Sequence, residues 1–278
     1  MFYLLLAVLS SAMVSVVMRL SSERVSGDVS LLAMNYLSGM IIAGFYTGPA
    51  NLIPLTPALP KTLLLGAIHG FLYLGTFMLL QLNQKKNGVV LSAIFMKLGL
   101  LVPMAVSMVF FKEMPAFIQL IGFVIAVFAI ILINFERGDT ALQFRFGLLL
   151  LLLGSGFADV MSKIYEEVGD PDLSSQFLFY TFVAAFVVCI LLMKAKKQRP
   201  GLSEVFFGAL LGIPNYFSAK FLLRALVDVP AVIAYPTYSV ATILLITLVG
   251  VAFFREKLSR RQWKALGVIL LALVLLNL

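Results

Sequence analysis

Ten apolar stretches of about 20 residues follow one another along the chain, and they constrain its fold more than any other feature. A helix must be about 20 residues long to cross the hydrocarbon core of a bilayer. The stretches are continuously apolar rather than alternating, which excludes a transmembrane barrel. The sequence therefore predicts an all-α membrane protein with ten transmembrane helices, at residues 2–20, 30–48, 62–82, 88–111, 115–134, 145–164, 174–193, 203–225, 229–253 and 261–278.

The composition agrees with this class. Hydrophobic residues make up 62% of the chain and charged residues 12%, whereas soluble domains are about half apolar and about a quarter charged. The connectors between the stretches are too short for a soluble domain. No lysine or arginine precedes the first stretch, so we expect a retained helix rather than a cleaved secretory signal. The single cysteine, Cys189, excludes an intrachain disulfide.

The basic residues are distributed unevenly between the two sets of loops. Fifteen lysines and arginines flank one set of alternate loops, and four flank the other. Because positive charge favours the cytoplasmic side, the richer set predicts the cytoplasmic face of an inner membrane. With ten helices, both termini then face outward. The net charge of +8 thus indicates topology and not nucleic-acid binding. The segment 194–200, KAKKQRP, is interpreted in the same way, with an anionic-lipid contact as the alternative.

The second half of the chain repeats the first. At an offset of 143 or 144 positions, Ser11 aligns with Ser155, Arg19 with Lys163, and Glu113 with Glu256. Each unit contains five predicted helices, an odd number, so the two units must lie antiparallel in the membrane. The sequence predicts two inverted five-helix repeats, residues 1–140 and 141–278, an architecture of secondary transporters.

Ten helices in two such repeats, each with an aromatic–basic–Glu stretch before its last helix (FFKEMPAFIQLIG and FFREKLSRRQWKALG), resemble EamA-type transporters of the drug/metabolite transporter superfamily. The resemblance implies a carrier that works by alternating access. It implies a cavity lined mainly by helices 1, 3, 4, 6, 8 and 9, with the last helix of each repeat at the periphery. Most members resemble proteins with cytoplasmic termini, whereas the loop charges here predict the reverse.

Lys97 lies near the middle of the apolar stretch 88–111. A lysine at the bilayer centre disfavours insertion by about 2.5–3.5 kcal/mol. Its repeat partner is Val240, so the fold does not require a charge there. We expect Lys97 to face the interior and to contact the anionic part of a substrate; a structural pairing with a buried acid such as Asp159 is the alternative.

Asp159 is the only acid deep within a predicted helix. Together with Ser155 and Lys163 it occupies one helix face, and Ser11, Ser15 and Arg19 occupy the equivalent face of the first helix. Lipid would not accommodate these faces, so both should point into the bundle. Asp159 is a candidate proton or substrate group, and an ion pair with Lys163 is the alternative. Ser15 is a candidate substrate contact.

Further polar side chains within apolar stretches are candidate cavity residues. In 203–225, Asn215 lies beside Pro214, and Lys220 is either a site residue or an anchor at the membrane surface. The remaining candidates are Tyr73, Tyr235 and Tyr238. His69 on the face of Tyr73 is interpreted as a packed residue. Glu113 and Glu256, at helix junctions, are interpreted as caps of the helices that follow them.

The sequence thus predicts a secondary transporter of a small polar metabolite, anionic or zwitterionic because the deep charges are mostly cationic. A coupled proton, and a monomer or homodimer in the lipid bilayer, complete the prediction. Alternatives are an exporter of cationic drugs or amines and a non-transporting accessory membrane protein. No nucleotide-binding, catalytic-triad or metal-ligand pattern is present in the sequence, so no enzyme activity, cofactor or metal is expected.

Overall fold

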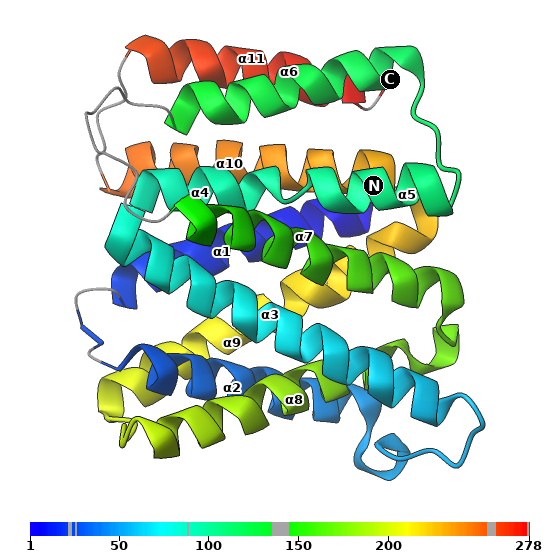
Figure 1. The fold of residues 1–278 in the computed structure, drawn as a ribbon, viewed down its shortest axis with the longest axis vertical. Helices are drawn as coiled ribbons and strands as arrows, with labels where there is room; N and C mark the ends of the chain where they lie inside the picture. Colours follow the sequence, from blue (N-terminus) through cyan, green and yellow to red (C-terminus); the bar gives the residue numbers. More distant parts are fainter. Residues whose placement is uncertain (22–23, 26, 88, 135–144, 255–259, 277) are drawn as a thin grey trace.

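The computed structural model is a bundle of long helices that run side by side (Figure 1) and describes residues 1–21, 24–25, 27–87, 89–134, 145–254, 260–276 and 278. No strand occurs in the described residues. The α-helices are α1 (Phe2–Ser21), α2 (Asp28–Thr47), α3 (Leu59–Asn87), α4 (Val89–Leu98), α5 (Leu101–Phe110), α6 (Phe117–Asn134), α7 (Arg145–Val168), α8 (Ser174–Ala195), α9 (Leu202–Asp228), α10 (Ala231–Phe254) and α11 (Arg260–Leu276). Two short 3₁₀ helices, Pro49–Asn51 and Pro171–Leu173, lie in connectors.

Seven helices of the described residues, α1, α2, α3, α7, α8, α9 and α10, are long and apolar enough to cross a bilayer. Their outward surface is apolar: Phe45, Phe117 and Phe253 are 79–80% exposed, while Asn35, Asn215 and Thr242 are at most 1% exposed. Apolar side chains outside and polar ones inside are the reverse of a water-soluble protein. The protein is a multi-pass membrane protein.

The apolar stretch 88–111, predicted as one helix, is two helices in the structure. The chain turns at Gly99 and Leu100, between α4 and α5. Pro103 favours the break, because its ring conflicts with the carbonyl of Gly99 four residues earlier and it has no N–H to donate. The turn packs closely on α7, since a Cβ at Gly156 would lie 2.6 Å from the Gly99 carbonyl oxygen. Lys97 therefore lies in the last turn of a short helix, beside irregular backbone of the kind that lines transporter cavities.

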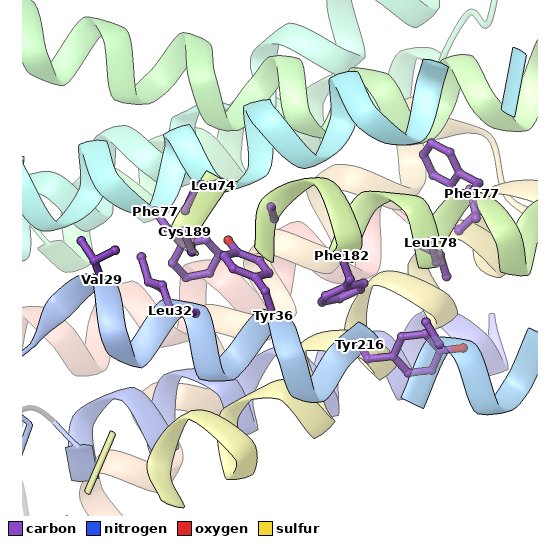
Figure 2. Packing of buried hydrophobic residues seen from close by; sticks show 14 of the residues in the cluster. Val29, Leu32, Tyr36, Leu74, Phe77, Phe177, Leu178, Phe182, Cys189 and Tyr216 are labelled. Carbon is purple, nitrogen blue, oxygen red and sulfur yellow. The ribbon is translucent and has the colours of Figure 1, made fainter. Parts of the chain in front are cut away.

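The largest apolar core lies between α2, α3, α8 and α9. Figure 2 shows Leu32 and Tyr36 of α2 facing Phe77 of α3 and Phe182 and Cys189 of α8. The Cys189 thiol is free and buried.

The helices α6 and α11 pack against each other at one edge of the bundle (Figure 1). Gly122 of α6 makes their close approach possible, because a Cβ there would lie 2.8 Å from the Cβ of Leu275. Both chain termini lie at the same end of the bundle (Figure 1), together with the connectors after α2, α5 and α7. We refer to it as the terminal end. The described turn between α8 and α9 lies at the opposite end.

Candidate functional site

An interior group of polar side chains forms the candidate site, and we call it the polar centre. Its two charged members are Lys97 at the end of α4 and Asp159 in α7. Tyrosines and serines of four further helices surround this pair. The uncharged members are Ser11 of α1, Tyr73 of α3, Ser218 of α9 and Tyr238 of α10.

Lys97 and Asp159 attract each other electrostatically. The structure describes both side chains, yet it joins them by no ion pair within 4.0 Å. The Lys97 ammonium lies instead 5.9 Å from the centroid of the Tyr238 ring, within the range of a cation–π contact. Both charged residues are surrounded by protein but remain partly exposed. Each charge therefore keeps capacity for another partner.

Hydrogen bonds hold the tyrosines of the polar centre in place. The Tyr238 hydroxyl lies 2.9 Å from the Ser218 hydroxyl, and Ser11 lies near it. The Tyr73 hydroxyl donates to Asn215 at 2.5 Å, and the Asn215 amide donates to Asn35 at 3.1 Å. Tyr73 in turn lies near enough to Tyr238 and Asp159 to interact with both electrostatically. The network links α2, α3, α9 and α10 around the charges.

Tyr235 supports the site rather than lining it. The side chain is fully buried, and its hydroxyl donates to the backbone carbonyl of Asp159 at 2.5 Å. This bond fixes α10 to α7 at the residue that carries the carboxylate. Because the bond uses the backbone oxygen, the Asp159 carboxylate is not consumed by it.

A second charged group, which we call the lysine lock, lies toward the terminal end. Lys163 of α7 is 2% exposed, and its ammonium contacts Glu113, Glu166 and Glu167 at 2.6–2.7 Å. The second oxygen of Glu113 accepts the Val232 N–H at the start of α10, at 3.3 Å. The lock thus joins the α5–α6 connector, α7 and α10.

Two sequence interpretations need correction at the lysine lock. Lys163 pairs with glutamates and not with Asp159, because these three carboxylates all lie within direct contact of its ammonium. Glu113 does cap a helix, but the helix is α10 and not α6, which follows it in the chain. The α6 N-terminus is capped by Gln119, whose side chain accepts the Ala116 N–H at 2.9 Å. Glu256 lies outside the described residues.

Two candidate site residues do not join the polar centre. The Lys220 ammonium lies 3.4 Å from the centroid of the Tyr46 ring, on the side of α9 that faces the end of α2. Ser15 bonds within its own helix, to the Ser11 carbonyl at 3.4 Å. His69 is buried and stacks on Phe177 with ring centroids 5.3 Å apart, as a packed residue would.

Sequence reasoning missed Asn35 and Ser218. Asn35 is fully buried in α2 and accepts from Asn215, and an asparagine within the apolar stretch 30–48 was a signal available in the sequence. Ser218 offers no such signal, because serine is tolerated on any face of a membrane helix.

The arrangement offers a cation, an anion and several hydroxyl groups at one interior position reached by parts of six helices. Such a set can bind a small molecule that carries a carboxylate or phosphate, an amine, or both. Among the described residues, no group of three His, Cys, Asp or Glu side chains is placed to hold a metal ion.

Comparisons with known proteins place the chain among membrane carriers. The model of the EamA-like transporter family matches residues 1–135 and 145–278. An uncharacterized protein of Haemophilus influenzae is 24% identical over 279 residues, covering 96% of this chain and 93% of that protein. One crystal structure superposes with a TM-score of 0.74 at 14% identity, over 99% of this chain and 98% of the other. At that identity the likeness shows the fold alone.

Proposed function

Because the chain belongs to the EamA-like transporter family, we propose that it is a secondary transporter of a small anionic or zwitterionic organic metabolite across the cytoplasmic membrane. The proposal rests above all on Lys97 and Asp159, two interior charges of opposite sign that are partly exposed and not directly paired. Interior charges without a direct partner disfavour folding. A ligand that binds both Lys97 and Asp159 best explains why the protein holds these charges apart.

In this proposal each member of the polar centre has a defined task. The Lys97 ammonium binds the carboxylate or phosphate of the substrate. Asp159 binds an amine on a zwitterion or, when the substrate has no amine, a proton that moves with it. The hydroxyls of Tyr73 and Tyr238 orient the substrate, because hydrogen bonds already fix their positions.

Alternating access requires an end of the bundle that can open and close. The lysine lock closes the terminal end in this state, since Glu113 and Lys163 come from opposite halves of the chain. We propose that residues 1–140 and 141–278 are inverted repeats that rock around the polar centre.

The substrate class can be tested by melting the purified protein with acidic, zwitterionic and cationic metabolites. A ligand at 100 times its dissociation constant stabilises the fold by about 2.7 kcal/mol. We expect stabilisation by acidic or zwitterionic compounds, followed by their uptake into proteoliposomes. Stabilisation by cationic compounds alone would contradict the substrate class, and uptake of none of them would contradict the carrier.

We predict that both termini face outward in the cytoplasmic membrane, because the basic loops should stay in the cytoplasm. In a Cys189→Ala background, the exposed residues Leu278 and Lys196 offer single-cysteine positions at the two ends of the bundle. A membrane-impermeant maleimide should label Leu278→Cys in intact cells, and Lys196→Cys only after lysis. The reverse pattern would refute the orientation.

We predict that Asp159→Asn lowers binding and transport at least tenfold, about 1.4 kcal/mol, while the melting temperature changes little. Asparagine nearly keeps the shape but removes the charge, and the bond from Tyr235 uses only the backbone carbonyl. Asp172→Asn is a matched control, since Asp172 is exposed at the terminal end. Unaltered transport by Asp159→Asn would remove Asp159 from the site. Loss of folding with unaltered binding by the surviving protein would assign Asp159 a structural role.

A further inference from the structure

A basic pocket lies where α8 ends and turns into α9, at the end of the bundle opposite the termini (Figure 1). Its volume is about 540 Å³. Ile190, Met193 and Lys194 lie three and four residues apart, so one face of α8 forms its main wall, and Lys197 follows just past the end of the helix. Gln198, Arg199 and Pro200 complete the lining.

The pocket joins two kinds of surface. Three of its lining residues are cationic, Lys194, Lys197 and Arg199, and no lining residue is acidic. One turn further into the bundle the wall becomes apolar at Ile190 and Met193. The neighbouring Val187 and Leu191 are 50% and 60% exposed on the outer surface of α8. An occupant that matches both surfaces carries an anionic head and an apolar tail.

The cationic side chains are not needed as hydrogen-bond donors to the free carbonyl groups at the end of α8. The N–H groups of Lys197 and Gln198 bond to the carbonyls of Lys194 and Met193 at 3.2 and 2.9 Å, which is the Schellman arrangement of a helix C-terminus. The backbone therefore caps itself. The lysine and arginine side chains remain available to a ligand.

Lys197 occupies the position in this motif that usually belongs to glycine. Its φ is +52°, in the left-handed region that disfavours side chains with a Cβ. Glycine would fit this backbone better but would bring no charge. Strained residues of this kind often mark a binding site. Here a lysine is present at the pocket despite the strain.

We propose that this pocket binds the phosphate headgroup of an anionic phospholipid, with its acyl chains along α8. The planar guanidinium of Arg199 suits a phosphate, and the two lysines add charge. The turn is also a junction of the bundle, because Glu204 of α9 accepts the N–H groups of Gly27 and Gly201 at 3.2 and 3.0 Å. A lipid bound there braces the end of α8 and the turn into α9, whichever substrate the polar centre carries.

The test uses the full chain, purified in a neutral detergent, with dioctanoyl phosphatidylglycerol as the probe. We expect this lipid to raise the melting temperature and to bind at a defined stoichiometry in native mass spectrometry. Dioctanoyl phosphatidylcholine, glycerol 3-phosphate and inorganic phosphate should have little effect. Equal stabilisation by inorganic phosphate would mean a site for free anions and would overturn the lipid assignment.

Two variants separate binding from folding. Without lipid, Lys197→Gly should melt at the same or a higher temperature than the wild type, because glycine relaxes the left-handed backbone. With phosphatidylglycerol, Lys197→Gly and Arg199→Gln should each weaken the apparent affinity at least tenfold. The control is Lys86→Gln, an exposed cation outside the pocket. An equal loss in Lys86→Gln, or an unchanged response in both pocket variants, would overturn the proposal.

Discussion

Lys97→Met is expected to abolish substrate binding and transport while the protein still folds. Methionine has a similar length but no charge, so the substrate's anionic group loses its partner in the polar centre. The loss of a charge-assisted contact inside a closed site should weaken binding at least a hundredfold, about 2.7 kcal/mol. Uptake into proteoliposomes and ligand-dependent melting would measure it.

The melting temperature of Lys97→Met distinguishes a binding role of Lys97 from a structural one. Removing Lys97 relieves part of the penalty of about 2.5–3.5 kcal/mol that a lysine at the bilayer centre carries. Asp159 loses its attraction to Lys97, but the two are not directly paired and Asp159 is partly exposed. The melting temperature without ligand should therefore be unchanged or higher, and higher still in Lys97→Met/Asp159→Asn.

The control is Lys264→Met, which removes the same charge from an exposed position in α11. It should transport as the wild type does. Undiminished transport by Lys97→Met would remove Lys97 from the site. A collapse of folding in Lys97→Met that Asp159→Asn rescues would show instead that the two charges form a structural pair.

Lys163→Met is expected to be the most destabilising of these substitutions. The change leaves Glu113, Glu166 and Glu167 close together without their shared cation, at side-chain exposures of 16%, 17% and 35%. Removing one partner of a fully buried pair costs about 3–5 kcal/mol. Since these carboxylates retain some contact with water, we expect about 2–3 kcal/mol, or a fall in melting temperature of about 4–12 °C.

The same variant should loosen the terminal end. In the proposed cycle the lysine lock holds that end closed, so its loss should make the polar centre accessible from there. With Cys189 replaced by alanine, Ser11→Cys should react faster with a water-soluble maleimide when Lys163 is methionine. Lys61→Met is the matched control, because Lys61 is exposed at the same end and donates to the Val168 carbonyl. Equal melting and labelling in Lys163→Met and the wild type would contradict the lock.

The membrane class, the helical fold and the unusual position of Lys97 and Asp159 within apolar stretches follow from the sequence alone. Each depends on a local property: the length of an apolar stretch, or the energetic penalty of a charge within it. The break before Pro103 did not follow from the proline alone, because Pro214 and Pro236 carry the same local conflict and lie inside the unbroken helices α9 and α10.

The partners of each polar residue were decided by the tertiary structure. Helical periodicity places residues on a common face, but it does not say toward which neighbour that face is rotated. In a soluble protein the apolar face would indicate the core; here both lipid and core are apolar, so hydropathy cannot distinguish them. Asn35 and Asn215, 180 positions apart, meet only because α2 packs on α9. The same reason explains why Lys163 pairs with Glu113 and why Lys220 contacts Tyr46. Long side chains contact the partners that helix packing brings within reach.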